Sequence, residues 1–592
     1  MELTRQQNDI LNATGNIRIN AVAGSGKTTT VIEYARRIPK NKTILYLAFN
    51  KSVKMEAQKR FNECGLQNVR IETAHSLAFS HVVASSHYKV KANGYQTSEL
   101  VPLLQIRSIG DALTEFIVAN HVARFMSYYC NSEKKSLKEL DYISVITDNK
   151  ARDFVKKHYR LIEAKTSLFF SLMNEGKIEI THDFYLKKFQ LSHPVFRYDY
   201  ILFDEGQDAS AAMLNIFLRQ NAVKVIVGDT HQQIYSWRYA VNSLEKVDFQ
   251  NYYLSESFRF GNDIALLATE VLKWKNHMID FKPVAIRGMG KQTTVKTRAV
   301  LARTNIGLLL KAIEILRGPK RINHIYFEGN FNSYTYADEG ASLYDVLNLH
   351  LGKIHLVRDP MIARMCCIED LEDYIEKTED KQLSMMVDIV KKYGDEIPAI
   401  LREIRAKHLP DQLRHKADVI FSTVHRCKGM EYDSVELVDD FYNEDKFKSC
   451  TIPEKEEFRR ELMLSEINLL YVAVTRARYE LHIPESLIPA GFPASKNIHI
   501  IAKKTKSDAI SVDDWRKITY RKSFPKTQEE ALAWVRAREN HHAAYRSWTR
   551  DMDDELRQMF NNGDTLSDIA KHTGRSKGAI MARMRLLELL DD

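Results

Sequence analysis

Residues 23–28, AGSGKT, have the types and the order that bind phosphate. Two glycines would let the backbone curl so that successive amides point at phosphate oxygens. The lysine would reach the terminal phosphates, and the threonine hydroxyl would hold magnesium. The predicted phosphate site therefore consists of Gly24, Ser25, Gly26, Lys27 and Thr28.

A strand must precede such a loop and a helix must follow it, and the sequence indicates both. Ile17 and Ile19 alternate with polar residues as in a short buried strand, and a helical pattern begins at Thr28. Ala21 departs from the GxxxxGK(S/T) pattern, which has glycine at that position. The alternative to nucleotide binding is a glycine-rich turn followed by a chance Lys-Thr pair.

Two carboxylates follow a second apolar strand in the segment YDYILFDEGQDAS. Asp204 would hold magnesium, and Glu205 would act as general base on the attacking water. The alternative is a pair of solvated carboxylates at a strand end. A further apolar run, VKVIVGD at 223–229, favours chemistry, because a parallel sheet would place this strand beside the preceding one. Three strand ends would then face one phosphate site.

The segment GDTHQQIYSWRYA, residues 228–240, combines groups for phosphate chemistry with aromatic groups that suit nucleic-acid bases. Tyr235 and Trp237 are offset by two residues, so an extended strand would present both on one face for base stacking. Arg238 would point to the other side and brace the nucleotide. The alternative is that both rings are buried packing aromatics.

Composition favours a soluble protein with several domains and a polyanionic partner. The chain has 592 residues, and 86 Lys and Arg against 77 Asp and Glu give a net charge of +9. Its six cysteines show no zinc spacing, and no apolar run approaches a membrane span. We expect a cytoplasmic protein, bacterial or phage-encoded rather than nuclear, with no membrane partner.

Ten segments occur in the order typical of one helicase family: LTRQQNDIL, AVAGSGKT, LYLAFNKSVK, TAHSLAF, DEGQD, VGDTHQQIYSWRYAVNSL, LSESFRFGNDIA, LARTN, STVHRCKGMEYDSVEL and LLYVAVTRAR. The chain resembles a superfamily 1 DNA helicase of the UvrD/Rep type. It is most similar to the helicase core of the F-box DNA helicases, and we expect it to lack an F-box. The resemblance implies an α/β fold with two RecA-like domains, ATP in the cleft between them, magnesium, and single-stranded DNA across both.

The resemblance also implies roles for residues near the nucleotide. Related helicases often carry an arginine against the base where this chain has Thr29. The other implied roles are adenine reading by Gln7, adenine stacking by Phe258, terminal-phosphate sensing by Gln232, a ribose contact by Glu431, and arginine fingers at Arg259 and Arg476.

Physical chemistry supports the two arginines independently of the resemblance. Phosphoryl transfer spreads negative charge, and a guanidinium delivered across a closing cleft stabilises that charge only when the domains meet. The alternative for Arg259 and Arg476 is a surface or ion-pair arginine.

Further DNA contacts are expected where strands end at the same sheet edge, and they rest mainly on the resemblance. For His75 and His425, an ordinary hydrogen-bonding role stays open as the alternative. The residues concerned are Phe49, Asn50, Thr73, His75, Thr423 and His425.

The positions of the motifs predict the domain boundaries. Both inserts are predicted to be mostly helical, and the stretch from Glu369 to Ile404 has the pattern of amphipathic helices. The predicted parts are RecA-like domain 1A (1–80 and 190–259) with insert 1B (81–189), RecA-like domain 2A (260–325 and 415–488) with insert 2B (326–414), a linker (489–525), and a terminal all-α domain (526–592).

The terminal domain resembles a Myb-like or helix-turn-helix module. Its apolar residues are spaced as in three short helices, at 556, 559 and 560, at 566, 569 and 570, and at 580, 584 and 587. Residues 571–585 hold five basic side chains and no acidic one. Arg575, Lys577 and Arg583 would contact DNA. The alternative is a module that docks on a protein.

The sequence predicts an ATP-driven motor that moves 3′ to 5′ on single-stranded DNA, as its resemblance implies. Such a motor unwinds duplex at junctions or displaces bound proteins such as a recombinase. Two alternatives stay open: a DNA-binding regulator whose ATPase is a switch, and a helicase-nuclease, although the C-terminal region shows no acidic metal cluster.

Overall fold

The chain forms two compact units, Met1–Lys503 and Lys504–Asp592. The computed structural model describes residues 3–84, 86–107, 113–282, 285–291, 294–319, 322–334, 341–453, 456–502, 550–561, 564, 566–573, 580–581, 583–584 and 587. Among the described helices, none has both the length and the apolar character needed to cross a bilayer.

The first sheet of unit Met1–Lys503 is parallel, with strand order β3-β2-β4-β5-β1-β6. Strands β4 and β5 pair in parallel, and β5 also pairs with β1, so the carboxyl ends of these three strands meet at one edge. The predicted neighbourhood of the three strands is confirmed. The strands are β1 (Ile17–Ala21), β2 (Ile44–Ala48), β3 (Val69–Thr73), β4 (Tyr200–Phe203), β5 (Val223–Gly228) and β6 (Gln250–Leu254).

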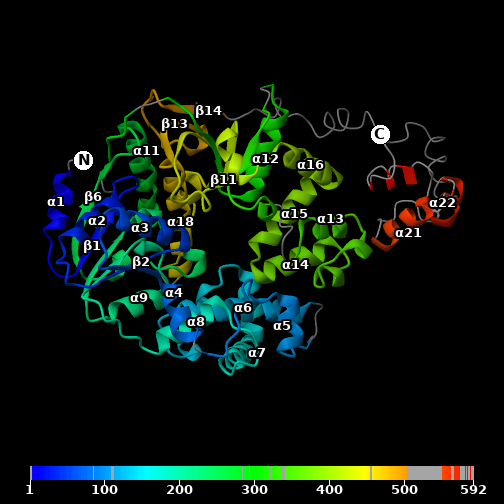
Figure 1. Ribbon diagram of the computed structural model, residues 1–592, viewed down its shortest axis with the longest axis horizontal. Coiled ribbons are helices and arrows are strands. Elements are labelled where there is room, and N and C mark those ends of the chain that lie inside the picture. The colour runs from blue at the N-terminus through cyan, green and yellow to red at the C-terminus, as the bar shows by residue number, and fades with distance from the viewer. Residues whose placement is uncertain are drawn as a thin grey trace. The chain divides into compact units, whose positions relative to one another are not determined.

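Helices that follow these strands cover the sheet (Figure 1). Apolar residues of α2, such as Val31 and Ala35, pack with Ile17, Ile19 and Tyr46 in one core. The helices around this sheet are α1 (Arg5–Leu11), α2 (Lys27–Arg37), α3 (Lys51–Glu63), α4 (Ala74–Val82), α9 (Ala211–Leu218) and α10 (Ser243–Lys246).

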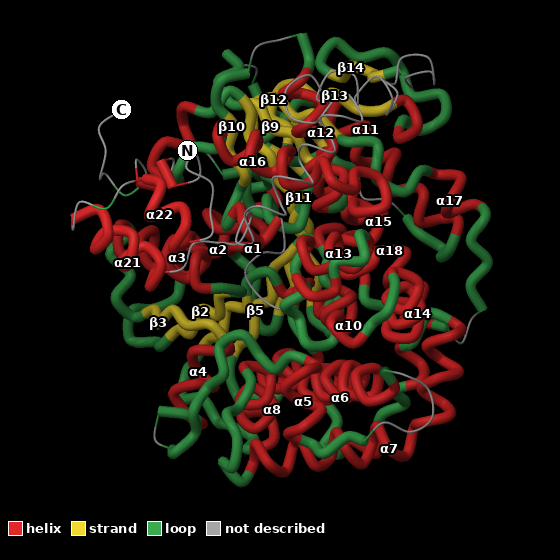
Figure 2. Tube along the Cα trace, turned by 90° about the vertical axis from the view of Figure 1, so that its right-hand side faces the viewer, coloured by secondary structure: helices red, strands yellow, loops and turns green. Residues whose placement is uncertain are grey.

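A helical segment between β3 and β4, here called the first insert, forms one layer in Figures 1 and 2. Its core is aromatic: the ring of Phe125 stacks on that of Tyr142 with centroids 4.5 Å apart. Its helices are α5 (Thr97–Leu103), α6 (Thr114–Asn131), α7 (Asn149–Asn174) and α8 (His182–Leu191).

The second sheet is also parallel, with strand order β10-β11-β9-β12-β13-β14. A core shared by α11 and α18 lies against this sheet. The strands are β9 (Arg298–Ala302), β10 (Ile325–Phe327), β11 (Val419–Thr423), β12 (Tyr432–Leu437), β13 (Ala477–Pro484) and β14 (Ile498–Ile501), and a short pair is formed by β7 (Glu256–Ser257) and β8 (Arg287–Gly288). The helices are α11 (Asn262–Lys273), the 3-10 turn η6 (Trp274–His277), α12 (Asn305–Arg317), α17 (Glu444–Lys448) and α18 (Glu457–Val474).

Two predicted boundaries are wrong. Strand β14 pairs with β13, so Ile498–Ile501 belong to the second sheet and not to the predicted linker. Strand β10 continues to Phe327, past the predicted end of the RecA-like segment at 325. The four residues of β14 were missed because an edge strand with two exposed positions carries little apolar pattern.

Between β10 and β11 lies a second helical segment, here called the second insert. Its helices bury one side, as Leu371 and Tyr374 show in α14 and Met386 and Val390 in α15, in agreement with the amphipathic pattern. The helices are α13 (Leu343–His350), α14 (Ile368–Thr378), α15 (Lys381–Tyr393) and α16 (Ile397–Lys407).

The two inserts contact each other through Glu379, the residue that ends α14 with a left-handed backbone (φ 56°). Its carboxylate accepts hydrogen bonds from the backbone N of Thr147 (2.7 Å), the Thr147 hydroxyl (2.6 Å) and the backbone N of Asp148 (2.5 Å). Arg124 of α6 adds an ion pair at 2.7 Å. Burial would raise the pKa of Glu379, but Arg124 and the hydroxyl of Thr147 lower it overall. The contact therefore stabilises an ionised carboxylate between the inserts.

Replacing Glu379 with alanine should lower the free energy of unfolding of this region by about 3 kcal/mol, because Arg124 would keep a buried charge without its partner. Glu376 is the matched control, because it also pairs across the inserts, with Lys150. Its side chain is 48% exposed, whereas that of Glu379 is 10% exposed. Glu376→Ala should cost under about 1 kcal/mol. Thermal unfolding and limited proteolysis compare the two variants; equal, small effects would show that the Glu379 contact does not hold the inserts together.

Unit Lys504–Asp592 contains a small apolar core. Helices α21 (Arg550–Asn561) and α22 (Leu566–Thr573) lie in it, and its buried members are Leu556, Ile569, Ile580 and Met584. These are positions that the helical spacing predicts. Arg583 donates two hydrogen bonds to the carboxylate of Asp553, at 2.8 and 2.6 Å, so this predicted DNA contact is engaged in an ion pair. Arg575 and Lys577 lie outside the described residues.

Candidate nucleotide and DNA site

The phosphate loop lies between β1 and α2, as predicted from the sequence. Gly24 and Gly26 have φ of +74° and +77°, a conformation that favours glycine. A Cβ at Gly24 would stand 2.5 Å from the Cβ of Arg259, so the close approach of that arginine also requires glycine. The hydroxyl of Ser25 is buried and has no hydrogen-bond partner in the described part of the chain. The loop thus offers a polar group that a phosphate oxygen would satisfy.

Lys27, the first residue of α2, forms an ion pair with Glu205 at 2.7 Å. Burial would lower the pKa of Lys27, but Glu205, Asp204 and Asp229 raise it overall, so the ammonium is retained. Burial would raise the pKa of Glu205, but Lys27 and Lys428 outweigh it and lower the pKa. Glu205 is therefore an ionised carboxylate, which is the form a general base needs.

Asp204 lies directly beside this pair at the end of β4. It accepts hydrogen bonds from the Tyr46 hydroxyl and from the backbone N of Glu205, the latter at 2.9 Å. Burial and the neighbouring Glu205 raise the pKa of Asp204, so a cation here would relieve an unfavourable charge. Among the described residues no cluster of three or more His, Cys, Asp or Glu side chains could hold a metal. The set of Asp204 and the Thr28 hydroxyl fits Mg²⁺, which commonly binds one or two protein oxygens together with phosphate oxygens.

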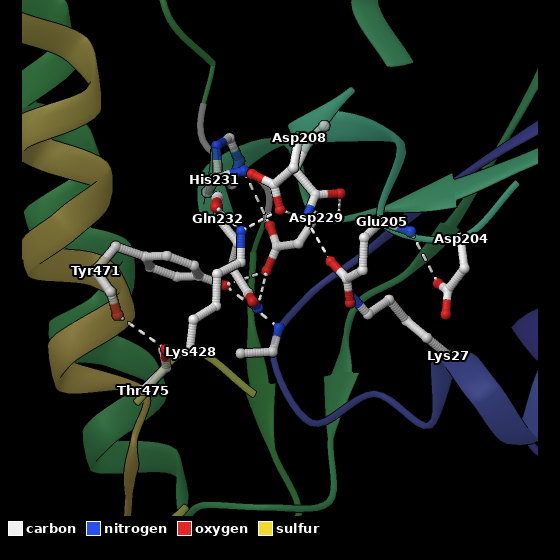
Figure 3. Close-up of polar contacts among 12 residues, drawn as sticks. Lys27, Asp204, Glu205, Asp208, Asp229, His231, Gln232, Lys428, Tyr471 and Thr475 are labelled. Carbon is white, nitrogen blue, oxygen red and sulfur yellow. Dashed lines mark hydrogen bonds and ion pairs between the residues drawn. The ribbon is translucent and has the colours of Figure 1, made fainter. Parts of the chain in front are cut away.

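Within unit Met1–Lys503 we call the part built on the first sheet the first half and the part built on the second sheet the second half. Asp229, directly after β5, is buried and contacts residues of both halves (Figure 3). Its carboxylate accepts from the Nε2 of Gln232 at 2.8 Å and from the hydroxyl of Tyr471, in α18, at 3.1 Å. The same hydroxyl accepts from the backbone N of Ala23 at 3.4 Å. Gln232, the predicted phosphate sensor, is therefore linked through Asp229 and Tyr471 to the phosphate loop. The sequence reasoning missed Tyr471; the signal was a tyrosine in an apolar helix, whose hydroxyl needs a partner when buried.

Lys428 makes a second connection from the second half. Its ammonium donates to the carboxylate of Asp208 and, at 2.6 Å, to the backbone carbonyl of Gln232. It also lies 5.0 Å from the ring centroid of Tyr235. Burial raises the pKa of Asp208 to about 6 despite this lysine. Lys428 was missed because one lysine before a glycine carries no pattern of its own.

The two predicted arginine fingers lie at the same junction. Arg476 is only 1% exposed, and its guanidinium donates to the carbonyls of Met430 at 2.9 Å and Val472 at 3.1 Å. Burial and the charge of Arg259 lower its pKa to about 10, and no carboxylate of the described chain pairs with it. The buried guanidinium is thus held by backbone carbonyls, and its role as an arginine finger stays a prediction.

Arg259, the other predicted finger, contacts both the phosphate loop and the second half. It donates to Glu431 at 2.9 Å and to the carbonyl of Thr475 at 3.0 Å. Glu431 also lies 3.7 Å from Arg478. The predicted ribose contact at Glu431 is thus paired with arginines, and Arg259 would have to leave it to meet a phosphate.

The residues predicted to bind adenine lie around the phosphate loop. The side chain of Gln7 donates to the Thr30 hydroxyl at 3.0 Å and accepts from the backbone N of Thr4 at 2.9 Å. Phe258 is exposed, and its backbone N donates to the carbonyl of Gly24 at 2.9 Å. Thr29 is half-buried in the first turn of α2. These positions leave the Phe258 ring available for stacking.

Tyr235 belongs to an aromatic group that spans both halves. Its ring stacks on Phe49 with centroids 6.0 Å apart, and its hydroxyl donates to the carbonyl of His425 at 3.1 Å. The ring of His425 meets that of Trp237 at 6.5 Å. Four of the predicted DNA-contact residues, Phe49, Tyr235, Trp237 and His425, are thereby brought together; we call them the aromatic cluster. Trp237 remains 49% exposed, so it is not a packing aromatic.

The predicted conformation of this segment is wrong. Ser236–Arg238 forms a 3-10 turn, η5, rather than an extended strand, so a two-residue offset does not place side chains on one face. Arg238 lies over the Trp237 ring, with its guanidinium 4.6 Å from the ring centroid, so the prediction that it points to the opposite side is wrong. Trp237 is accessible because its ring lies exposed beside His425, and not because a strand presents it.

The other predicted DNA contacts lie outside the aromatic cluster. Asn50 caps α3 by accepting from the backbone N of Val53 at 2.9 Å, and Thr73 caps α4. The ring of His75 meets Tyr185 edge-on, and burial lowers its pKa. Thr423 is buried at the end of β11. Asn50 is exposed, so its cap leaves it accessible to a ligand.

Comparison with known proteins finds related helicases. A family model described as the UvrD/REP helicase N-terminal domain matches residues 3–249, and one described as the UvrD-like helicase C-terminal domain matches residues 367–486. F-box DNA helicase 1 of Gallus gallus is 32% identical over 82% of this chain and 49% of that protein. F-box DNA helicase protein 1 of Schizosaccharomyces pombe is 26% identical over 80% and 56%. ATP-dependent DNA helicase PcrA of Leuconostoc citreum is 23% identical over 55% and 46%.

The chain spans about half the length of the curated relatives it matches. Both family models fall on the two halves that carry the parallel sheets, and the site lies where those halves meet. The chain therefore belongs to the UvrD/Rep family of helicases.

Proposed function

We propose that the protein is an ATP-driven DNA helicase that moves 3′ to 5′ on single-stranded DNA, unwinding duplex at junctions or displacing bound proteins such as a recombinase. One observation carries the proposal: residues 229–238 join the buried phosphate-side network at Asp229 and Gln232 to the exposed ring of Trp237. A change at the nucleotide can reach the DNA through this one segment.

In the nucleotide step, ATP would lie on the phosphate loop, with Lys27 turned from Glu205 to the terminal phosphates. The freed carboxylate of Glu205 would take a proton from the attacking water at an Oε atom. Magnesium, held by Thr28 and Asp204, would supply positive charge to the phosphate oxygens. Arg476 and Arg259, from the second half, would stabilise the charge that develops as the cleft closes.

On the DNA side, bases would stack on the aromatic cluster. Every base has a π-face, so stacking suits movement along any sequence. Because the cluster draws on both halves, with Tyr235 bonded to the carbonyl of His425, a shift between the halves would move the bases. The relatives named as DNA helicases support DNA as the substrate.

Strand displacement on matched duplexes with a 3′ or a 5′ tail tests the proposal. We expect ATP-dependent release of a labelled strand only from the 3′-tailed duplex, and displacement of streptavidin from a biotinylated 5′ end. DNA-stimulated hydrolysis without any displacement would instead indicate an ATPase switch. Loss of circular single-stranded DNA in the presence of magnesium would indicate a nuclease.

A further inference from the structure

Lys275 is a buried lysine to which the proposed reaction assigns no role. It lies in η6, after α11, and is 5% exposed. Burial lowers its pKa to about 8, although Glu245 and Asp229 oppose the change from a distance. No carboxylate in the described ranges comes within 4 Å of its ammonium. A buried charge without an ion pair is costly, so its position calls for a reason.

The polar partner that the structure gives Lys275 is His231. The Nζ atom lies 3.2 Å from Nδ1 of the imidazole. An ammonium can only donate, so Nδ1 accepts and the ring proton is on Nε2. Burial, followed by the charge of Lys275, lowers the pKa of His231 well below its usual value, which keeps the ring neutral.

Aromatic side chains also pack against Lys275 and His231. The ring of Phe281 lies 5.1 Å from the Lys275 ammonium and meets the His231 ring edge-on at 5.4 Å. Tyr471 meets the same imidazole edge-on at 5.9 Å. The orientation of His231 is therefore set by groups from the second half of the unit.

His231 lies directly beside the predicted phosphate sensor. Its backbone N donates to Oδ1 of Asp229 at 3.0 Å, while Gln232 donates to Oδ2 of the same carboxylate. Figure 3 shows His231, Gln232 and Tyr471 converging on Asp229. His231 and the sensor share the short turn η4 (Thr230–Gln232), so a contact that holds the imidazole also holds that turn.

We propose that Lys275 is a positioning residue for ATP hydrolysis: its ammonium holds the His231 ring and, through it, the turn that carries Gln232. The inference rests on the proposed ATP-driven function. Trp274 of η6 packs in the same core as α11 and α18, so Lys275 belongs to the second half. The Lys275–His231 contact thus adds a link from the second half to the turn of the sensor, besides those of Lys428 and Tyr471.

Lys275→Met keeps the length of the side chain and removes its donor. We expect kcat of DNA-stimulated ATP hydrolysis to fall between about 5- and 150-fold. KM for ATP should stay unchanged, because Lys275 does not touch the phosphate loop. The midpoint of thermal unfolding should not fall, since an apolar side chain of similar volume replaces an unpaired buried charge. A lower unfolding midpoint with an unchanged kcat would mean that Lys275 is only structural, and would overturn the proposal.

Lys273→Met is the matched control, since this lysine is 47% exposed and pairs with Glu270. It should leave kcat at the wild-type value. His231→Leu removes the acceptor, and it keeps the proposal testable where Lys275→Met fails to fold. If the two residues act through each other, the double variant should lose no more kcat than the worse single variant. Additive losses would overturn the proposal.

Measurements on the wild-type protein distinguish failure of the proposed function from failure of the positioning role. Wild type without any DNA-stimulated hydrolysis would contradict the proposed function itself. Wild type with stimulated hydrolysis, together with a Lys275→Met variant of equal kcat, would contradict only the positioning role.

Discussion

Lys27→Ala should lower the rate of ATP hydrolysis by at least about 100-fold, the scale seen when one group that stabilises developing charge is removed. The physical reason is that the variant loses the ammonium that would reach the terminal phosphates when ATP is bound. Without nucleotide, the same ammonium pairs with Glu205 at 2.7 Å. Steady-state phosphate release at saturating ATP and DNA measures the effect.

Lys40→Ala is the control for this experiment, because Lys40 is exposed just beyond α2 and receives the same substitution. It should hydrolyse ATP at the wild-type rate. If Lys27→Ala kept more than about a tenth of the wild-type rate, the phosphate loop would not take part in ATP hydrolysis as proposed.

Trp237→Ala should raise the concentration of single-stranded DNA needed for half-maximal stimulation by about 5- to 150-fold. This range corresponds to the 1–3 kcal/mol that one base–aromatic stack contributes. The ring is 49% exposed beside His425, and Arg238 lies over it at 4.6 Å, so its removal takes away the platform and frees the guanidinium. The rate without DNA should change far less than in Lys27→Ala. Hydrolysis at saturating ATP, titrated with oligothymidine from zero, measures both the half-maximal DNA concentration and the rate without DNA.

Tyr344→Ala serves as the control, since Tyr344 is an aromatic residue exposed to 38% on α13. Its half-maximal DNA concentration should match wild type. If Trp237→Ala lowered the DNA-independent rate as strongly as Lys27→Ala does, Trp237 would be a structural residue and not a DNA contact.

The phosphate site and the DNA-contact segment differ in how far they could be predicted from the sequence. The phosphate loop is local: strand, glycines, lysine and helix follow one another within residues 17–37, and the structure has them in that order. The carboxylates Asp204 and Glu205 follow an apolar strand, and the parallel rule for strand ends was enough to bring them to the same edge. Local pattern was also sufficient for the buried residues of the terminal core, such as Leu556 and Ile569.

Local pattern failed where a turn replaced a strand. A two-residue spacing of aromatics fits an extended strand, but the same residues also fit a 3-10 turn, and the choice depends on what each side chain meets. Here the hydroxyl of Tyr235, the residue directly before the turn, bonds to the carbonyl of His425, 190 residues away. In the turn, Arg238 lies over Trp237 instead of on the opposite side.

By itself, the sequence determined the phosphate loop and the acidic pair at the same sheet edge, because glycine dihedrals, apolar alternation and strand-end chemistry are properties of short segments. The two RecA-like domains were expected from the resemblance to UvrD/Rep helicases. Only the tertiary structure decided that Tyr471, Lys428 and Lys275 meet Asp229, Gln232 and His231. A buried polar group takes whatever partner the packing delivers, and Tyr471 is 242 residues from Asp229. That choice depends on how two sheets pack against each other, which no local pattern of residues contains.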